Sequence, residues 1–122
     1  NSNDNTKAIK KIINTNKLFG QWNDFVVNAN WTPSIEKGFF KLWVNGKLVY
    51  HYIGRTAVPE DQITVQFGIY RGAAQSSGDA NHIIFYDEIR KAKSCEKLKL
   101  KKLGYNCEDL QNQKLEDIYL IK

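Results

Sequence analysis

The sequence lacks a long apolar run, and it lacks the short motifs of several enzyme classes. A membrane-spanning helix requires about 20 predominantly apolar residues, and no stretch of this chain approaches that length. There is no Ser-His-Asp order, phosphate-binding loop, nucleotide-binding glycine fingerprint or metal-binding histidine pair. We therefore expect no membrane partner and find no support for nucleotide-dependent or zinc-dependent chemistry.

Cysteine is scarce, with only Cys95 and Cys107 in 122 residues. Two thiols without a nearby histidine provide too few ligands for a zinc site. If oxidised, the pair would close a loop and add about 3 kcal/mol of stability, which would suit an exported protein. Two free cysteines are the alternative, and the sequence does not decide between them.

The excess of basic residues is modest and unevenly placed. The net charge is +5, from 18 Lys and Arg against 13 Asp and Glu. Most of this excess lies in residues 91–122. The balance allows a polyanion as partner, but no basic run is interleaved with aromatic residues in the way that tracks a nucleic-acid backbone. We therefore do not expect nucleic acid as a partner.

Methionine is absent, and the chain begins at Asn1 in a polar run without a visible signal peptide. A processed chain would have lost such a peptide. The chain is therefore compatible with a mature form or with a piece of a larger protein. Its length accommodates one domain.

Four stretches alternate apolar and polar residues or carry a hairpin signal, as β-strands do. They are residues 22–31, 39–52, 63–71 and 81–90. Short connections between them predict an all-β fold, an antiparallel sandwich or jelly roll. In the tail, Ser94 is expected to cap a helix over residues 95–103 that Gly104 ends, and Asn106 to cap a second helix.

The clearest local signal is Asn45-Gly46 between two apolar runs. Asn-Gly is preferred in two-residue type I′ turns, because both residues tolerate positive φ. This turn would pair Trp43 with Leu48 and Lys41 with Tyr50, and paired residues share a face. The resulting aromatic face, with Lys41 inside it, is either a core wall with a snorkelling lysine or a carbohydrate platform. We favour the core wall.

The stretch 63–71 has two faces with different properties. Ile63, Val65, Phe67 and Ile69 would form an apolar face, whereas Thr64, Gln66, Gly68 and Tyr70 would form the other. A glycine between an amide and a phenol leaves a notch where a ligand can approach the backbone. The stretch is either a half-exposed strand or the floor of a binding or catalytic groove.

Tyrosine beside a cation suits one reaction in particular, the β-elimination of a uronic acid polymer. Tyr70 would act as the acid/base beside Arg71. Gln66 would lie about 13 Å away along the strand and would contact a neighbouring sugar unit. The residues that we expect to contact the substrate are Gln66, Arg71, Lys41, Trp43, Tyr50 and His82.

An ordered series of motifs resembles the heparin lyase I-like polysaccharide lyases over about residues 20–91. The series is Trp22-Asn-Asp-Phe-Val-Val, Trp31-Thr-Pro, Leu42-Trp-Val-Asn-Gly-Lys47, Phe67-Gly-Ile-Tyr-Arg71 and Phe85-Tyr-Asp-Glu-Ile-Arg90. The resemblance implies a concanavalin-like β-jelly roll related to glucuronan and alginate lyases. It also implies an anionic polysaccharide as substrate and a secreted or periplasmic location. The resemblance specifies no cofactor with certainty, although a structural calcium ion is allowed.

The family carries a Lys-x-Gly-x-Tyr pattern whose tyrosine is the catalytic acid/base. Tyr70 and Gly68 match it, whereas Gln66 stands where the family often has lysine. The family's jelly roll is about twice as long, and its catalytic histidine and carboxylate-neutralising residue come largely from the earlier half. The resemblance therefore implies a lead-in (1–20), the C-terminal portion of a jelly roll (21–92) and a helical tail (93–122). It also implies that a missing N-terminal half or a second chain completes the sandwich.

A non-catalytic module is the main alternative. Laminin-G-like and other concanavalin-like carbohydrate-binding modules share the hairpin and an ending such as Asp87-Glu-Ile-Arg90. A purely structural fragment is a third interpretation. The segment Phe67-Gly-Ile-Tyr-Arg71 favours the lyase, because a binding module has no reason to hold it.

Overall fold

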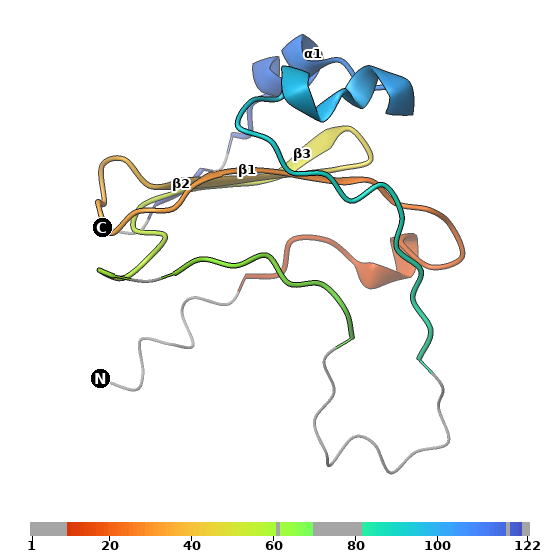
Figure 1. Ribbon diagram of the computed structural model, residues 1–122, viewed down its shortest axis with the longest axis horizontal. Helices are drawn as coiled ribbons and strands as arrows, with labels where there is room; N and C mark the ends of the chain where they lie inside the picture. Colours follow the sequence, from red (N-terminus) through yellow and green to blue (C-terminus); the bar gives the residue numbers. More distant parts are fainter. Residues whose placement is uncertain (1–9, 61, 70–81, 117, 121–122) are drawn as a thin grey trace.

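The computed structural model describes residues 10–60, 62–69, 82–116 and 118–120, and its centre is a β-sheet with strand order β1-β2-β3-β4 (Figure 1). Strands β1 (Phe25–Asn30), β2 (Phe39–Val44) and β3 (Lys47–Ile53) are antiparallel neighbours. The two-residue β4 (Tyr119–Leu120) pairs in parallel with β3. The strand expected within residues 22–31 and the expected hairpin are thus confirmed.

The hairpin turns at Asn45 and Gly46, which both adopt positive φ, 52° and 83°. This is the conformation that a type I′ turn requires. A Cβ atom added at Gly46 would lie 2.8 Å from the ring of Tyr105, so the close approach of that ring also demands glycine. The type of turn was therefore predictable from these two residues.

A register shift in the hairpin corrects one prediction. Trp43 pairs with Leu48 as expected, but the register shifts between Leu42 and Trp43, and Lys41 pairs with His51 instead of Tyr50. The extra residue in β3 forms a β-bulge, which re-aims the side chains that follow it. Tyr50 consequently belongs to the face opposite Lys41.

The two faces of the sheet differ in character. The tail face carries Val26, Trp43 and Leu48 near the hairpin turn, and Asn28, Lys41 and His51 further along the strands. The apolar face carries Phe25, Val27, Ala29, Phe40, Leu42, Val44 and Tyr50. Residues 10–20, with the short 3-10 helix η2 (Thr15–Lys17), lie on the side of the sheet away from the tail (Figure 1).

The tail consists of short helical turns. They are the 3-10 helices η4 (Glu96–Leu98) and η5 (Leu100–Leu103) and the α-helix α1 (Cys107–Asn112). The expected single helix over 95–103 is wrong, because Lys99 is left-handed (φ 55°) and separates the two turns. Gly104 (φ 91°) ends η5, and the Asn106 side chain accepts a hydrogen bond from the Glu108 N–H, as predicted.

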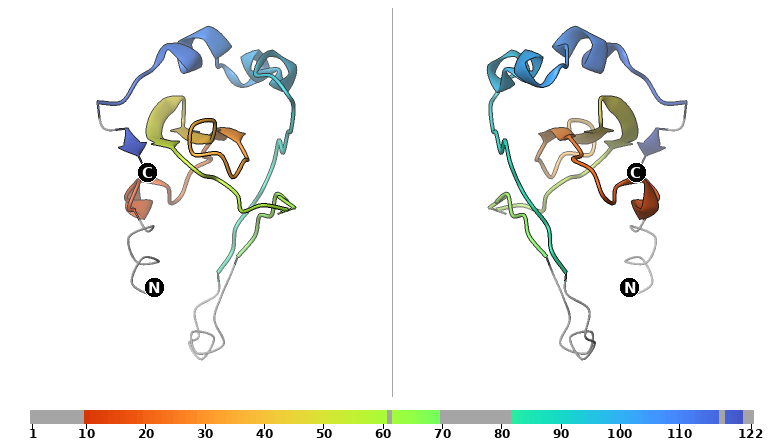
Figure 2. Two further views of the ribbon diagram at one scale, coloured as in Figure 1. Left: turned by 90° about the vertical axis from the view of Figure 1, so that its left-hand side faces the viewer. Right: turned by 90° about the vertical axis from the view of Figure 1, so that its right-hand side faces the viewer.

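The tail covers the turn end of the tail face (Figure 2). Trp43, Leu48, Leu100 and Leu110 form the buried core, and none of these four is more than 6% exposed. The Trp43 indole N–H donates to the Leu110 carbonyl at 2.9 Å. Gln113 receives a hydrogen bond from the Leu48 N–H and donates one to the Gly46 carbonyl, both at 2.8 Å. Cys95 and Cys107 are joined by a disulfide bond that links the two parts of the tail.

The other two expected strands are not formed where the chain is described. Residues 62–69 and 82–92 form no β-strand, and their apolar side chains are exposed, with Val65 at 71% and Phe85 at 76%. We call them the two extended segments. A strand pair is marginal in water unless its apolar face packs against a second layer, and neither segment buries such a face. A tilted contact between Phe67 and Tyr86, with ring centroids 5.0 Å apart, brings the segments together.

The fold class is therefore confirmed as mostly β and partial, with a short helical tail. Among the described residues, no helix has the length and hydropathy to cross a membrane.

Candidate functional site

The proposed catalytic tyrosine and its neighbour cannot be placed, because Tyr70 and Arg71 lie outside the described residues. Gln66 and His82 are exposed in the two extended segments. Their roles remain predictions.

The carbohydrate platform, which was the alternative to the favoured core wall, does not form. Trp43 is only 3% exposed, and its indole N–H is used by Leu110, so this side chain belongs to the core wall. Tyr50 lies on the apolar face, where its ring centroid is 6.1 Å from that of Phe40. The grouping of Tyr50 with Lys41 and Trp43 is therefore wrong, and the bulge in β3 is the physical reason.

The register instead aligns Lys41 with two polar side chains. Asn28 of β1 pairs with Lys41 of β2, and Lys41 pairs with His51 of β3. Because paired residues share a face of the sheet, the three lie side by side. We call Asn28, Lys41 and His51 the polar row. Asn28 is exposed, whereas Lys41 and His51 are half-buried.

The environment of the polar row affects its histidine. Burial, and secondarily the positive charge of Lys41, lowers the pKa of His51 below its usual value. At neutral pH a neutral imidazole offers one N–H donor and one acceptor. The row therefore presents an amide, an ammonium group and an imidazole, which are suited to binding polar or anionic groups. No local sequence signal predicts the pairing of Lys41 with His51, because it depends on the bulge.

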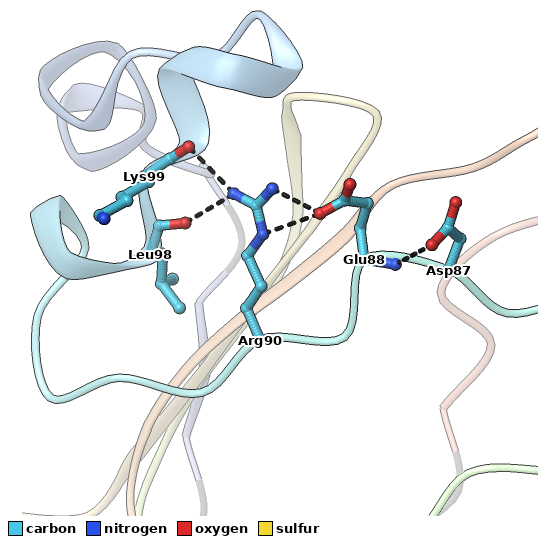
Figure 3. Close-up of polar contacts among 5 residues, drawn as sticks. All are labelled: Asp87, Glu88, Arg90, Leu98 and Lys99. Carbon is cyan, nitrogen blue, oxygen red and sulfur yellow. Dashed lines mark hydrogen bonds and ion pairs between the residues drawn. The ribbon is translucent and has the colours of Figure 1, made fainter.

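A second polar cluster joins the end of the extended segment 82–92 to the tail (Figure 3). The Arg90 guanidinium donates to the carbonyls of Leu98 and Lys99, at 2.8 and 3.0 Å, and pairs with the Glu88 carboxylate. The Glu88 N–H in turn donates to the Asp87 carboxylate. The Asp-Glu-Ile-Arg motif thus holds the first turns of the tail, which is a structural role.

Tyr105 makes the third notable polar contact. Its hydroxyl donates to the carboxylate of Asp24, and this hydrogen bond, with burial and the Asp24 charge, raises the pKa of Tyr105 to about 12. Such a phenol stays protonated at neutral pH and is not poised to act as a base. The contact fastens the tail to the residue before β1.

Two further features of the described chain carry no site. A shallow pocket between residues 12–18 and the hairpin is lined by Ile12, Val44 and Val49 and lies on the apolar face, away from Lys41. No group of three or more His, Cys, Asp or Glu side chains gathers in the described part of the chain. We therefore assign no residues to the calcium ion that the resemblance allows.

Comparison with known families gives one match. Residues 1–90 match a family model described as polysaccharide lyase. The match includes the sheet strands β1 to β3 and both extended segments, and it ends where the Arg90 cluster meets the tail. No curated protein and no solved structure matches the chain.

Proposed function

This chain belongs to the polysaccharide lyase family, and from that premise we propose that it cleaves an anionic, uronic-acid-containing polysaccharide by β-elimination. The observation that carries the proposal is the extent of the family match, which spans residues 1–90 and so includes Phe67-Gly-Ile-Tyr70. Within the family we favour the heparin lyase I-like type, on the motif series described above.

The proposed chemistry centres on Tyr70. As a base it takes the proton from the carbon α to the carboxylate, and a carbon–carbon double bond forms as the glycosidic C–O bond breaks. The leaving oxygen receives a proton from the same phenol. Arg71 favours the tyrosinate form and neutralises the carboxylate as charge develops on it. Gln66 and His82 contact neighbouring parts of the sugar chain.

A complete sandwich requires a second layer over the apolar face. Phe25 and Val27 on that face are 54% and 48% exposed, and the extended segments expose further apolar side chains. Contiguous apolar surface of this kind is characteristic of an interface. We propose that either a preceding segment of the same fold or a second chain covers this face, and that the protein is secreted or periplasmic.

The proposal is tested with Tyr70→Phe in the full-length protein. Turnover is followed as the ultraviolet absorbance of unsaturated uronate released from glucuronan, alginate and heparin. Removal of a general acid/base should lower the rate by about 100-fold or more, while the affinity for the polymer stays the same. Tyr86→Phe, at an exposed tyrosine of the other extended segment, is the matched control and should keep full turnover.

Two results would contradict the proposal. Full turnover by Tyr70→Phe would remove this tyrosine from the mechanism. Binding of acidic polymers by the unmodified protein, without unsaturated product from any of them, would favour a carbohydrate-binding module.

A further inference from the structure

The polar row is a cationic feature that the tyrosine chemistry does not use. Its three members come from three adjacent strands, so the row runs across the sheet and not along one strand. Adjacent strands lie about 4.8 Å apart, which makes the row about 10 Å long. This is a larger contact surface than a single ion requires.

On strands β1 to β3, the nearest positions around the row on the same face carry no neutralising carboxylate. Two residues further along each strand on the same face are Asn30, Phe39 and Ile53. Two or three residues back, toward the turn, they are Val26, Trp43 and Leu48. In the described part of the chain neither Lys41 nor His51 forms an ion pair. A half-buried lysine without an internal counterion is a favourable place for an external one.

The tail bounds the row on one side. Trp43 lies two residues from Lys41 on β2, about 7 Å along the strand toward the turn. It is capped by Leu110 and by the helical turns of the tail. Figures 1 and 2 show these turns standing on the tail face over the hairpin end of the sheet. The tail therefore forms a wall on the side of the row that faces the turn.

We infer that the polar row binds the acidic group, carboxylate or sulfate, of a polysaccharide unit. Lys41 supplies the charge, and Asn28 and His51 supply hydrogen bonds to the acidic group or to the adjacent hydroxyls. The identity of the ligand as a sugar polymer rests on the proposed function, whereas the attraction for an acidic group rests on the row itself. Trp43 and Tyr50 take no part.

The test is a calorimetric titration of the full-length protein with three oligosaccharides of equal length. Oligoglucuronate carries carboxylates, a heparin oligosaccharide adds sulfates, and a cello-oligosaccharide is neutral. We expect binding of one or both acidic ligands and much weaker binding of the neutral one. Lys41→Gln should lower the affinity for the acidic ligand about tenfold, as the loss of a charge-assisted contact does, and His51→Gln should lower it less.

Lys47→Gln is the matched control. It removes the same charge from the same hairpin, but Lys47 pairs with Val44 on the opposite face. The Lys47→Gln variant should bind the acidic ligand with the same affinity as the unmodified protein. An equal loss in Lys47→Gln would show that the net positive charge, and not the row, attracts the ligand, and unchanged binding by Lys41→Gln would also overturn the inference. Lys41→Arg, which keeps the charge, should retain binding.

The inference and the proposed function fail separately. Binding that depends on Lys41 without any unsaturated product supports the row and contradicts the lyase activity. Turnover that depends on Tyr70, with Lys41→Gln binding normally, supports the activity and contradicts the row.

Discussion

The hairpin with its tail and the two extended segments are both rich in apolar residues, yet they differ in what covers those residues. Trp43 and Leu48 are 3% and 2% exposed, whereas Phe67 and Phe85 are 60% and 76% exposed. The alternation of apolar residues is as regular in the segments as in the hairpin. The difference is that the tail provides a second layer for the hairpin, and no described part of the chain does so for the segments. Burial thus depends on a partner layer as much as on the strand pattern.

The largest expected effect is the difference in stability between two variants, each of which truncates one aromatic residue in one of the regions. Trp43→Ala should lower the free energy of unfolding by about 3–5 kcal/mol, because it removes a buried indole and leaves a cavity. Phe67→Ala should change it by less than about 0.5 kcal/mol, because that ring is mostly solvated. Urea denaturation followed by circular dichroism measures both. Similar losses for the two variants would show that the segments are buried in solution, and the comparison would fail.

The second effect concerns the disulfide bond that closes the tail. Cys95 and Cys107 are 12 residues apart in the chain, and opening a loop of this size should cost about 3 kcal/mol. Reductant should lower the urea midpoint of the unmodified protein by a corresponding amount. The Cys95→Ser/Cys107→Ser double variant should show the lower midpoint at once and should not respond to reductant. A double variant as stable as the oxidised protein would mean that the tail packs without the bond.

The smallest effect is the pH dependence from Tyr105. Its pKa of about 12 in the folded protein is above the usual 10, so the folded state keeps a proton that the unfolded state loses between these values. The stabilisation is fully present below pH 10 and should decline as the pH rises from about 10 toward 12. Urea midpoints at a series of alkaline pH values should therefore fall more steeply for the unmodified protein than for Tyr105→Phe. Parallel curves would show that the Asp24 contact is not formed in solution.

Local signals predicted the parts of the fold that depend on few residues. Asn45-Gly46 specified the turn, and Gly104 and Asn106 specified a helix end and a helix start. The bulge in β3 and the docking of the tail were not predictable in this way. The bond from Trp43 to Leu110 joins residues 67 positions apart, and only the packed fold brings them together.

The candidate site was predictable to a smaller extent. Lys41 lies on a strand of the expected hairpin, but its predicted neighbour Tyr50 lies on the other face. His51 became its neighbour on β3 through a shift of one residue, which reverses the face of every side chain beyond it, whereas Asn28 faces it in the regular pairing of β1 with β2. Residue types alone do not report such a shift. The proposed role of Tyr70 rests on the motif and the family, and the turnover experiment tests it.

The Arg90 cluster has a consequence for the limits of the protein's functional unit. The family match ends at Arg90, but the guanidinium of this residue holds the backbone of Leu98 and Lys99 beyond it. The indole of Trp43, well inside the match, is covered by Leu110 from outside it. A protein cut at the boundary of similarity would lose the cover of its own core. The part of this chain that resembles the family and the part that is needed to cover its core therefore end at different residues.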